Sequence, residues 1–202
     1  MSRFIWQSVK TEYREERPSH HGTELRWILN IETILDTQIG KTTTRGVVRH
    51  PGIAVIAPIL DDGRIAIMRQ YRYSLDGELW ELPAGTLNGR EVNGRMVATE
   101  SPIECAGREL LEETGFEAGR IEPLLDCYTM PGSNDEVIHV FAAHDLTKHE
   151  QSLDVGEVIL EVRGFTHDEI MEMIRKGEIR DAKTIVGLLF LFSQRQPAPK
   201  NA

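Results

Sequence analysis

The chain has 202 residues, of which 40% are hydrophobic and 27% charged, which is typical of a soluble globular protein with one domain and room for a small appendage. Its formal net charge of −9 argues against nucleic-acid binding, because an acidic surface repels phosphates. No apolar run approaches the ~20 residues that span a bilayer, and the first residues lack the apolar core of a secretory signal. Cys105 and Cys127 have no zinc-site spacing. We therefore expect a cytoplasmic protein. Because its net charge is negative, a phosphate-bearing substrate would bind only with the help of a divalent cation or of well-placed arginines.

Runs of β-branched and aromatic residues alternate along the chain with amphipathic segments. The predicted strands are 25–37, 52–60, 64–72, 78–85, 136–144 and 158–165, and the predicted helices are 102–114, 167–176 and 182–194. The turn dipeptide Asp62-Gly63 predicts that 52–60 and 64–72 form a hairpin. Strands interleaved with helices favour an α/β fold with a mixed sheet covered on both faces. We expect residues 1–45 to form a separate β layer, 46–195 the main domain and 196–202 a disordered tail.

The helix over 102–114 has signals at both ends. Ser101 is a suitable N-cap, Pro102 suits the first helical position, and Gly115 stands where a C-cap glycine belongs. The apolar positions expected to face the core are Ile103, Ala106 and Leu110.

Three carboxylates share one arc of that helix. Glu109 and Glu113 are four residues apart and Glu112 lies beside them, so their like charges should repel one another. The arrangement makes physical sense if a divalent cation neutralises the cluster, and oxygen ligands favour magnesium, manganese or calcium over zinc. The alternative is a solvated acidic face.

A longer pattern includes this helix. From Gly94 the chain reads glycine-x5-Glu-x7-Arg-Glu-apolar-x-Glu-Glu-x-Gly-apolar, ending at Phe116. This pattern resembles the Nudix box with no position missing. In the family the segment "LPAG" usually runs straight into the box, whereas here "TLNGREVNGR" separates them and is similar to an inserted loop over 86–95. Gly85 and Gly94 are therefore both candidates for the box glycine.

Four further segments are similar to the branch of that family that hydrolyses ADP-ribose and related nucleoside diphosphate sugars. They are "RIAIMRQYRY", "LWELPAG", "MPGSNDE" and "GEIRDAKTIVGL". Pro131, placed 16 residues after Gly115, matches a proline marker of the branch. The resemblance implies a Nudix α/β/α sandwich with a mixed sheet. It also implies a homodimer in which the N-terminal β layer contributes to the partner's site.

The resemblance implies hydrolysis of a diphosphate, which for ADP-ribose gives AMP and ribose 5-phosphate. Glu109 and Glu113 would be the main ligands of Mg²⁺, or of Mn²⁺. Glu112 would contribute directly or through water, and the backbone carbonyl of Ala84 would be the ligand from outside the helix.

Two supporting residues and a general base are also implied. Arg108 would hold a neighbouring glutamate in place, and Glu100 would support the box through pairing or a water molecule. Glu157, in "SLDVGEVILEV", matches the position of the base, and Glu161 is the second candidate. Ordinary solvated glutamates at a strand end are the alternative reading of both.

The substrate-binding candidates lie elsewhere in the chain. Arg72 matches a phosphate-binding arginine of the branch, and its planar fork suits a diphosphate; Arg69 is a weaker candidate. Glu136 is placed to hydrogen-bond the nucleoside or ribose. Trp27 and Trp6 are candidates for stacking on a base. Surface salt bridges and core packing are the alternatives.

Two other functions remain open. One is a Nudix hydrolase of a GDP-sugar, a dinucleoside polyphosphate or NADH, because the box handles the diphosphate and not the flanking groups. The other is a sensor that binds ADP-ribose without cleaving it, which the complete set of box carboxylates disfavours.

Overall fold

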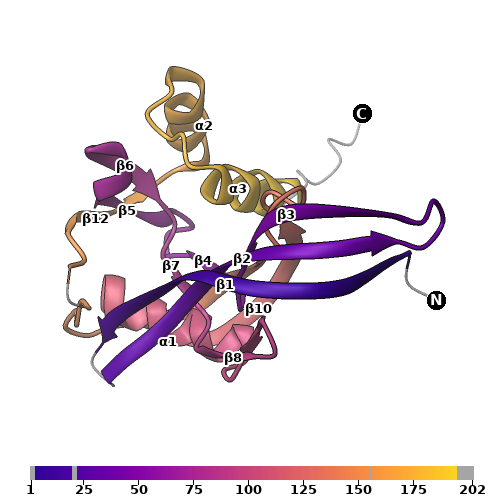
Figure 1. The fold of residues 1–202 in the computed structure, drawn as a ribbon. Coiled ribbons are helices and arrows are strands. Elements are labelled where there is room, and N and C mark those ends of the chain that lie inside the picture. Colours follow the sequence, from indigo (N-terminus) through magenta and orange to yellow (C-terminus); the bar gives the residue numbers. More distant parts are fainter. Residues whose placement is uncertain (1–2, 20–21, 155, 195–202) are drawn as a thin grey trace, which may run out of the picture. The chain divides into compact units, whose positions relative to one another are not determined.

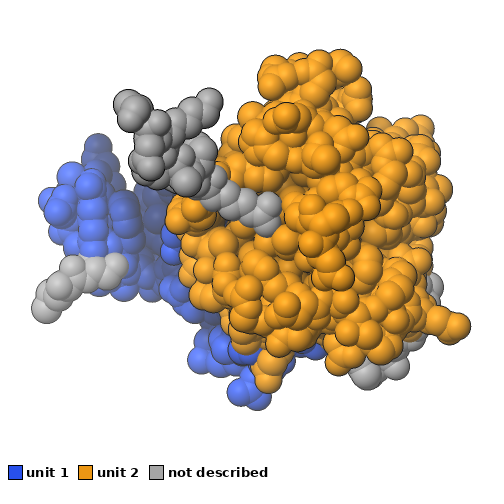
Figure 2. All heavy atoms as spheres, turned by 180° about the vertical axis from the view of Figure 1, so that it is seen from behind, with its two compact units in different colours: residues 1–53, 86–101, 127–138 blue, residues 54–85, 102–126, 139–202 orange. Residues whose placement is uncertain are grey.

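The structure is a computed structural model that describes residues 3–19, 22–154 and 156–194 (Figure 1). The predicted tail 196–202 lies outside these residues. The chain forms two compact units: unit 1 comprises 1–53, 86–101 and 127–138, and unit 2 comprises 54–85, 102–126 and 139–202 (Figure 2). Among the described residues, no helix is long and apolar enough to cross a membrane.

Unit 1 is built on a three-stranded antiparallel sheet. Its strands are β1 (Phe4–Ser19), β2 (Gly22–Asp36) and β3 (Lys41–Arg49), in the order β1-β2-β3 (Figure 1). Side chains alternate between the two faces of a strand, and β2 buries Ile28, Asn30 and Glu32 on one face. The buried face of this sheet is therefore partly polar, and its polar groups need partners.

The segment predicted as a loop over 86–95 is instead part of a short hairpin in unit 1. It consists of β8 (Gly89–Val92) and β9 (Arg95–Ala98). Asn93 and Gly94 between them have φ of 52° and 74°, the left-handed pair that a two-residue hairpin turn requires. The side-chain amide of Asn30 donates to the Gly94 carbonyl at 2.7 Å. The loop prediction was wrong because the glycine and polar residues form a tight turn between paired strands.

Unit 2 contains most of two further sheets. One has the order β10-β11-β4-β7 and the other β12-β5-β6. Their strands are β4 (Ile53–Pro58), β5 (Ile65–Arg72), β6 (Gly77–Glu81), β7 (Ala84–Thr86), β10 (Phe116–Tyr128), β11 (Val137–Lys148) and β12 (Ile159–Phe165). A 3-10 turn, η1 (Tyr73–Leu75), joins β5 to β6.

The two strands predicted as a hairpin, 52–60 and 64–72, pair with each other only next to the turn. Ile59 and Ile65 form an isolated bridge, and the Leu60 amide donates to the Arg64 carbonyl at 2.9 Å. Beyond this point β4 lies between β11 and β7, whereas β5 lies between β12 and β6. Each strand already has a partner on both edges, so the two strands belong to different sheets.

The helices begin and end where the sequence predicts. They are α1 (Pro102–Thr114), α2 (His167–Lys176) and α3 (Ala182–Gln194). A Cβ on Gly107 of α1 would lie 3.4 Å from Ile121 of β10, and one on Gly187 of α3 would lie 3.2 Å from Val140 of β11. Both helices therefore pack closely on strands, and the mixed α/β class expected from the sequence is confirmed.

Candidate active site

Helix α1 turns its carboxylate face inward. Glu109 and Glu113 are 4% and 1% exposed, and Ala106 and Leu110 are fully buried. Ile103, expected on the buried stripe, is 45% exposed. That prediction was wrong because the buried face of the helix is rotated toward its glutamates. Burial of two carboxylates on one face is costly unless charge or hydrogen bonds compensate it.

The segment 84–85 lies against these carboxylates. The backbone N–H of Ala84 donates to Oε2 of Glu113 at 2.8 Å. A Cβ on Gly85 would lie 1.7 Å from Oε1 of Glu109, so any larger residue there would force the Glu109 side chain to move. Gly85 therefore makes the close approach to the box helix, and Gly94 stands at the turn of the β8–β9 hairpin.

Burial and mutual repulsion raise the pKa values of the helix carboxylates. Burial raises the pKa of Glu109 to about 7, with Arg108 opposing the rise and Glu112 and Glu157 adding to it. Burial also raises the pKa of Glu113 well above its usual value, and the charges of Glu109 and Glu157 raise it further. The pKa of Glu112 is raised by burial as well. Burial and mutual repulsion of these carboxylates therefore outweigh the opposing charges of Arg108 and Arg72.

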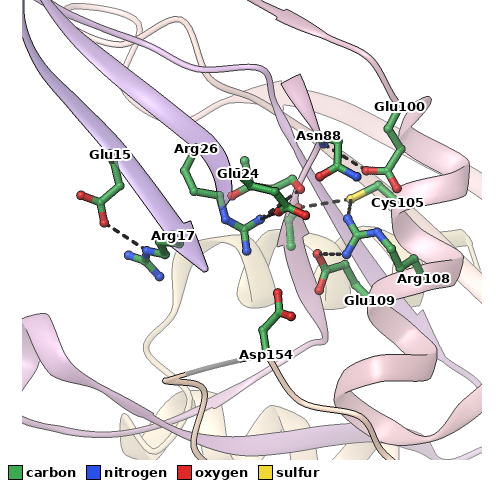
Figure 3. A network of polar contacts seen from close by, with 12 residues as sticks. Glu15, Arg17, Glu24, Arg26, Asn88, Glu100, Cys105, Arg108, Glu109 and Asp154 are labelled. Carbon is green, nitrogen blue, oxygen red and sulfur yellow. Dashed lines mark hydrogen bonds and ion pairs between the residues drawn. The ribbon is translucent and has the colours of Figure 1, made fainter. Parts of the chain in front are cut away.

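Arg108 supplies the nearest positive charge. Its Nη1 donates to Glu109 at 2.8 Å and to Glu112 at 3.0 Å. Figure 3 shows the guanidinium extending from α1 toward Glu109 and Cys105, whose sulfur accepts from Nη2 at 3.5 Å. One arginine thus faces two carboxylates, whereas Glu113 accepts from the Ala84 amide.

Arg72 lies in a second ionic cluster of unit 2. Its guanidinium makes a two-pronged pair with Glu81, at 2.7 and 2.6 Å, and its charge lowers the pKa of Glu113. Lys183 pairs with Glu81 and with Asp181. Sequence reasoning missed Glu81 and Lys183. Their signal was a glutamate inside an apolar strand and a lysine in the first turn of an apolar helix, both of which need a charged partner when buried.

Glu157 and Arg69 have different surroundings. The structure places Glu157 where its charge raises the pKa of Glu109, Glu112 and Glu113. Its Oε2 accepts from the Asp154 amide at 3.2 Å. Arg69 instead pairs with Glu78 at 2.7 Å and lies 3.6 Å from Glu161, and all three side chains are exposed to a third or more.

The other candidates belong to unit 1. Glu100 accepts from the Asn88 amide at 3.0 Å, which braces the segment before β8 (Figure 3). Glu136 lies 3.5 Å from Nε2 of His50. The half-buried ring of Trp27 contacts Tyr13, with centroids 5.4 Å apart. Pro131 is exposed.

Trp6, the second tryptophan considered for base stacking, has cationic neighbours. The guanidinium carbons of Arg49 and Arg95 lie 5.2 and 4.3 Å from its ring centroid. The ring therefore already stacks against two cations of unit 1.

The donor set around α1 fits a hard divalent cation. Glu109, Glu112 and Glu113 offer carboxylate oxygens, and their buried charge exceeds what Arg108 and Arg72 neutralise. Within the described ranges, no three acidic, histidine or cysteine side chains are already arranged around one point as in a formed metal site. Glu113 is turned to the Ala84 amide and Glu109 to Arg108.

A sequence model of the NUDIX domain matches residues 48–187, which is more than half of the chain. The chain belongs to the NUDIX domain family. The resemblance noted from the box is thus confirmed, and this Nudix protein is a hydrolase of pyrophosphate bonds.

Two curated relatives of this Nudix chain have named substrates. It is 33% identical over 153 residues to an ADP-ribose pyrophosphatase of Bacillus subtilis (strain 168), covering 75% of this chain and 78% of that protein. It is 31% identical over 150 residues to a GDP-mannose pyrophosphatase of Yersinia enterocolitica, covering 70% and 73%.

A solved structure described as ADP compounds hydrolase has a similar fold. Its TM-score is 0.73 at 18% identity, with 96% of this chain and 95% of that chain covered. The expected Nudix fold is thereby confirmed.

Proposed function

We propose that this Nudix hydrolase cleaves the diphosphate of ADP-ribose with magnesium and releases AMP and ribose 5-phosphate. The observation that carries the proposal is the buried pair Glu109 and Glu113, which lies against Ala84 and Gly85 and whose pKa values are raised by burial. The similarity to an ADP-ribose pyrophosphatase over three quarters of the chain supports the substrate.

In this proposal the oxygens of Glu109, Glu112 and Glu113, with the Ala84 carbonyl, would hold Mg²⁺ or Mn²⁺. Such an ion would neutralise charge on the phosphates and make water more acidic. Arg108 keeps Glu109 and Glu112 oriented through the contacts described above. Glu100, through the Asn88 amide, keeps the preceding segment in place. Helix α1 is a rigid support for these ligands.

The side chains carry out the remaining steps by positioning and proton transfer. Water attacks one phosphorus, a new P–O bond forms, and the bond to the bridging oxygen breaks. Glu157 accepts the proton of that water. Its charge lies close to the carboxylates of α1, but Glu157 is not on that helix and is not a proposed metal ligand. Arg72 neutralises charge on the phosphate oxygens, and its two bonds to Glu81 fix the orientation of its guanidinium.

We assign the ribose and the base to two of the candidates named from the sequence. Glu136 hydrogen-bonds the ribose, in the segment marked by Pro131. Trp27, whose ring is half-buried, stacks on the base. Arg69, already paired on an exposed surface, has the weaker claim to the phosphates.

A nucleotide panel tests the proposal. Purified protein is incubated with ADP-ribose, GDP-mannose, a dinucleoside polyphosphate and NADH, with magnesium and with a chelator, and the products are separated by chromatography. We expect ADP-ribose to give AMP in the magnesium arm and nothing in the chelator arm. Preference for GDP-mannose would move the enzyme to the GDP-sugar alternative, which the 31% identical relative favours. Tight binding of ADP-ribose without products would show a sensor.

We also propose that the protein is a homodimer whose N-terminal strands complete the partner's site. Support comes from the exposed apolar side chains of β1, which include Phe4, Ile5 and Tyr13. A dimer interface at β1 would remove such side chains from water. Sedimentation equilibrium measures the mass: a value of twice 22.9 kDa is expected, and a monomer at micromolar concentration would contradict the proposal.

A further inference from the structure

The segment from Pro131 to Glu136 is fastened to the end of β3 in unit 1. The Val48 amide donates to the Ser133 carbonyl at 2.9 Å, and the Asp135 amide donates back to the Val48 carbonyl at 3.3 Å. One side-chain oxygen of Asp135 accepts from the His50 amide at 2.8 Å. The segment is therefore held to the end of β3 at Ser133 and at Asp135.

Arg49 adds a charged connection from the interior of unit 1. Its Nε and Nη2 make a two-pronged pair with Glu32 of β2, at 2.8 and 2.6 Å. Its Nη1 donates to the second oxygen of Asp135 at 2.9 Å. The side chains of Arg49 and Glu32 are 12% and 3% exposed, so this guanidinium has little freedom to rotate.

Glu32 is itself held in place. The Asn30 side-chain amide donates to it at 3.3 Å, and Asn30 is also the residue that binds the Gly94 carbonyl. The chain of contacts therefore runs from the buried face of β2 through Arg49 to Asp135. Glu136 follows directly, with its amide donating to Asn134 Oδ1 at 2.7 Å.

The fastened segment borders open space. Residues 131–135, together with Trp6 and Arg49, line a cavity of about 340 Å³ within unit 1. Because Glu136 has been assigned to the ribose above, the orientation of this segment has a direct consequence for binding.

We propose that Arg49 is a positioning residue for substrate. Anchored on Glu32, it fixes Asp135 and so sets the orientation in which Glu136 meets the ribose. The inference rests on the proposed function, and it assigns Arg49 no contact with the reacting phosphates. Loss of Arg49 therefore weakens substrate binding and leaves the chemical step on α1 intact.

The test is Arg49→Lys, which keeps the charge and removes the planar fork. We expect the KM for ADP-ribose to rise about tenfold, the scale of one lost charge-assisted bond, with kcat within twofold of wild type. Arg64→Lys is the control, because Arg64 also donates through Nε to a carboxylate, that of Asp62 at the turn between β4 and β5, at 2.7 Å. The control should leave KM unchanged.

Asp135→Asn provides a second route if Arg49→Lys does not fold, since it leaves the Glu32–Arg49 pair intact. It should raise KM to a similar extent, and the double variant should be no worse than either single one. An unchanged KM, a loss confined to kcat, or additive effects of the two substitutions on KM would overturn the inference about Arg49. The proposed function would still stand if the wild type turned over ADP-ribose. A wild type that turns over no nucleotide would overturn both.

Discussion

Gly85 and Glu109 occupy adjoining space so closely that a Cβ on the glycine would lie 1.7 Å from the carboxylate oxygen Oε1. The "LPAG" segment can therefore pack directly against α1 because Gly85 has no side chain. The inserted hairpin separates these segments in sequence, yet this contact within unit 2 is present.

Gly85→Ala should displace Glu109. Overpacking of this kind costs about 1–3 kcal/mol of stability, and the magnesium concentration for half-maximal activity should rise at least about tenfold because a proposed ligand moves. Urea denaturation and magnesium titration of activity measure the two effects. Gly46→Ala is the control, since its Cβ would meet only Ile31, at 3.9 Å. Equal behaviour of the two variants would contradict the close contact.

Glu113→Gln removes a proposed metal ligand while preserving its shape. We expect kcat to fall at least about 10²-fold, the scale on which single charge-stabilising groups act in active sites. Steady-state kinetics in saturating magnesium provide the measurement. Glu117→Gln, which changes an exposed carboxylate of β10, should be unaffected. Near-wild-type turnover of the Glu113 variant would refute the metal assignment.

Glu157→Gln separates the proposed base from the ligands. The amide cannot accept the proton of the attacking water, so kcat should fall while magnesium affinity stays nearly unchanged. Magnesium affinity is measured by isothermal titration, and kcat from product formation. A collapse of magnesium affinity would make Glu157 a ligand. If Glu161→Gln lowered kcat and Glu157→Gln did not, the general base would be Glu161.

His50 should make unit 1 sensitive to acid. The ring is 7% exposed, and its Nδ1 accepts from the Gly52 amide at 3.1 Å, so the neutral ring carries its proton on Nε2, toward Glu136. Burial lowers the pKa of His50 from 6.5 to about 4; Asp135 opposes this shift and Arg26 adds to it.

The sign of the effect follows from that lowered pKa. His50 takes up its proton near pH 6.5 in the unfolded chain and only near pH 4 in the folded chain. The contribution of neutral His50 to the free energy of unfolding is therefore fully present above pH 6.5 and is lost as the pH falls toward 4. At pH 5 the loss should be about 2 kcal/mol. Urea denaturation of wild type and His50→Asn at pH 7.5 and 5.0 isolates this contribution. Identical losses in both proteins would contradict it.

The local signals in the sequence predicted much of the fold. Capping residues and apolar periodicity determine where a helix starts and stops, and α1, α2 and α3 have the predicted bounds. The hairpin predicted at Asp62-Gly63 failed for a different reason. A turn signal describes four residues, whereas the partner of a strand depends on which other edges compete for it, and β4 and β5 each have two other partners.

The sequence by itself determined the family, the box helix and the stacking of Glu109 with Glu113, because these depend on residue type and on the 3.6-residue repeat. Only the tertiary structure decided that these carboxylates are buried against Ala84 and Gly85. It also decided that Glu81 and Lys183 share one ionic cluster with Arg72, and that Arg49 joins Glu32 to Asp135. Contacts between residues far apart in the chain depend on packing and burial, and neither is encoded in spacing along the sequence.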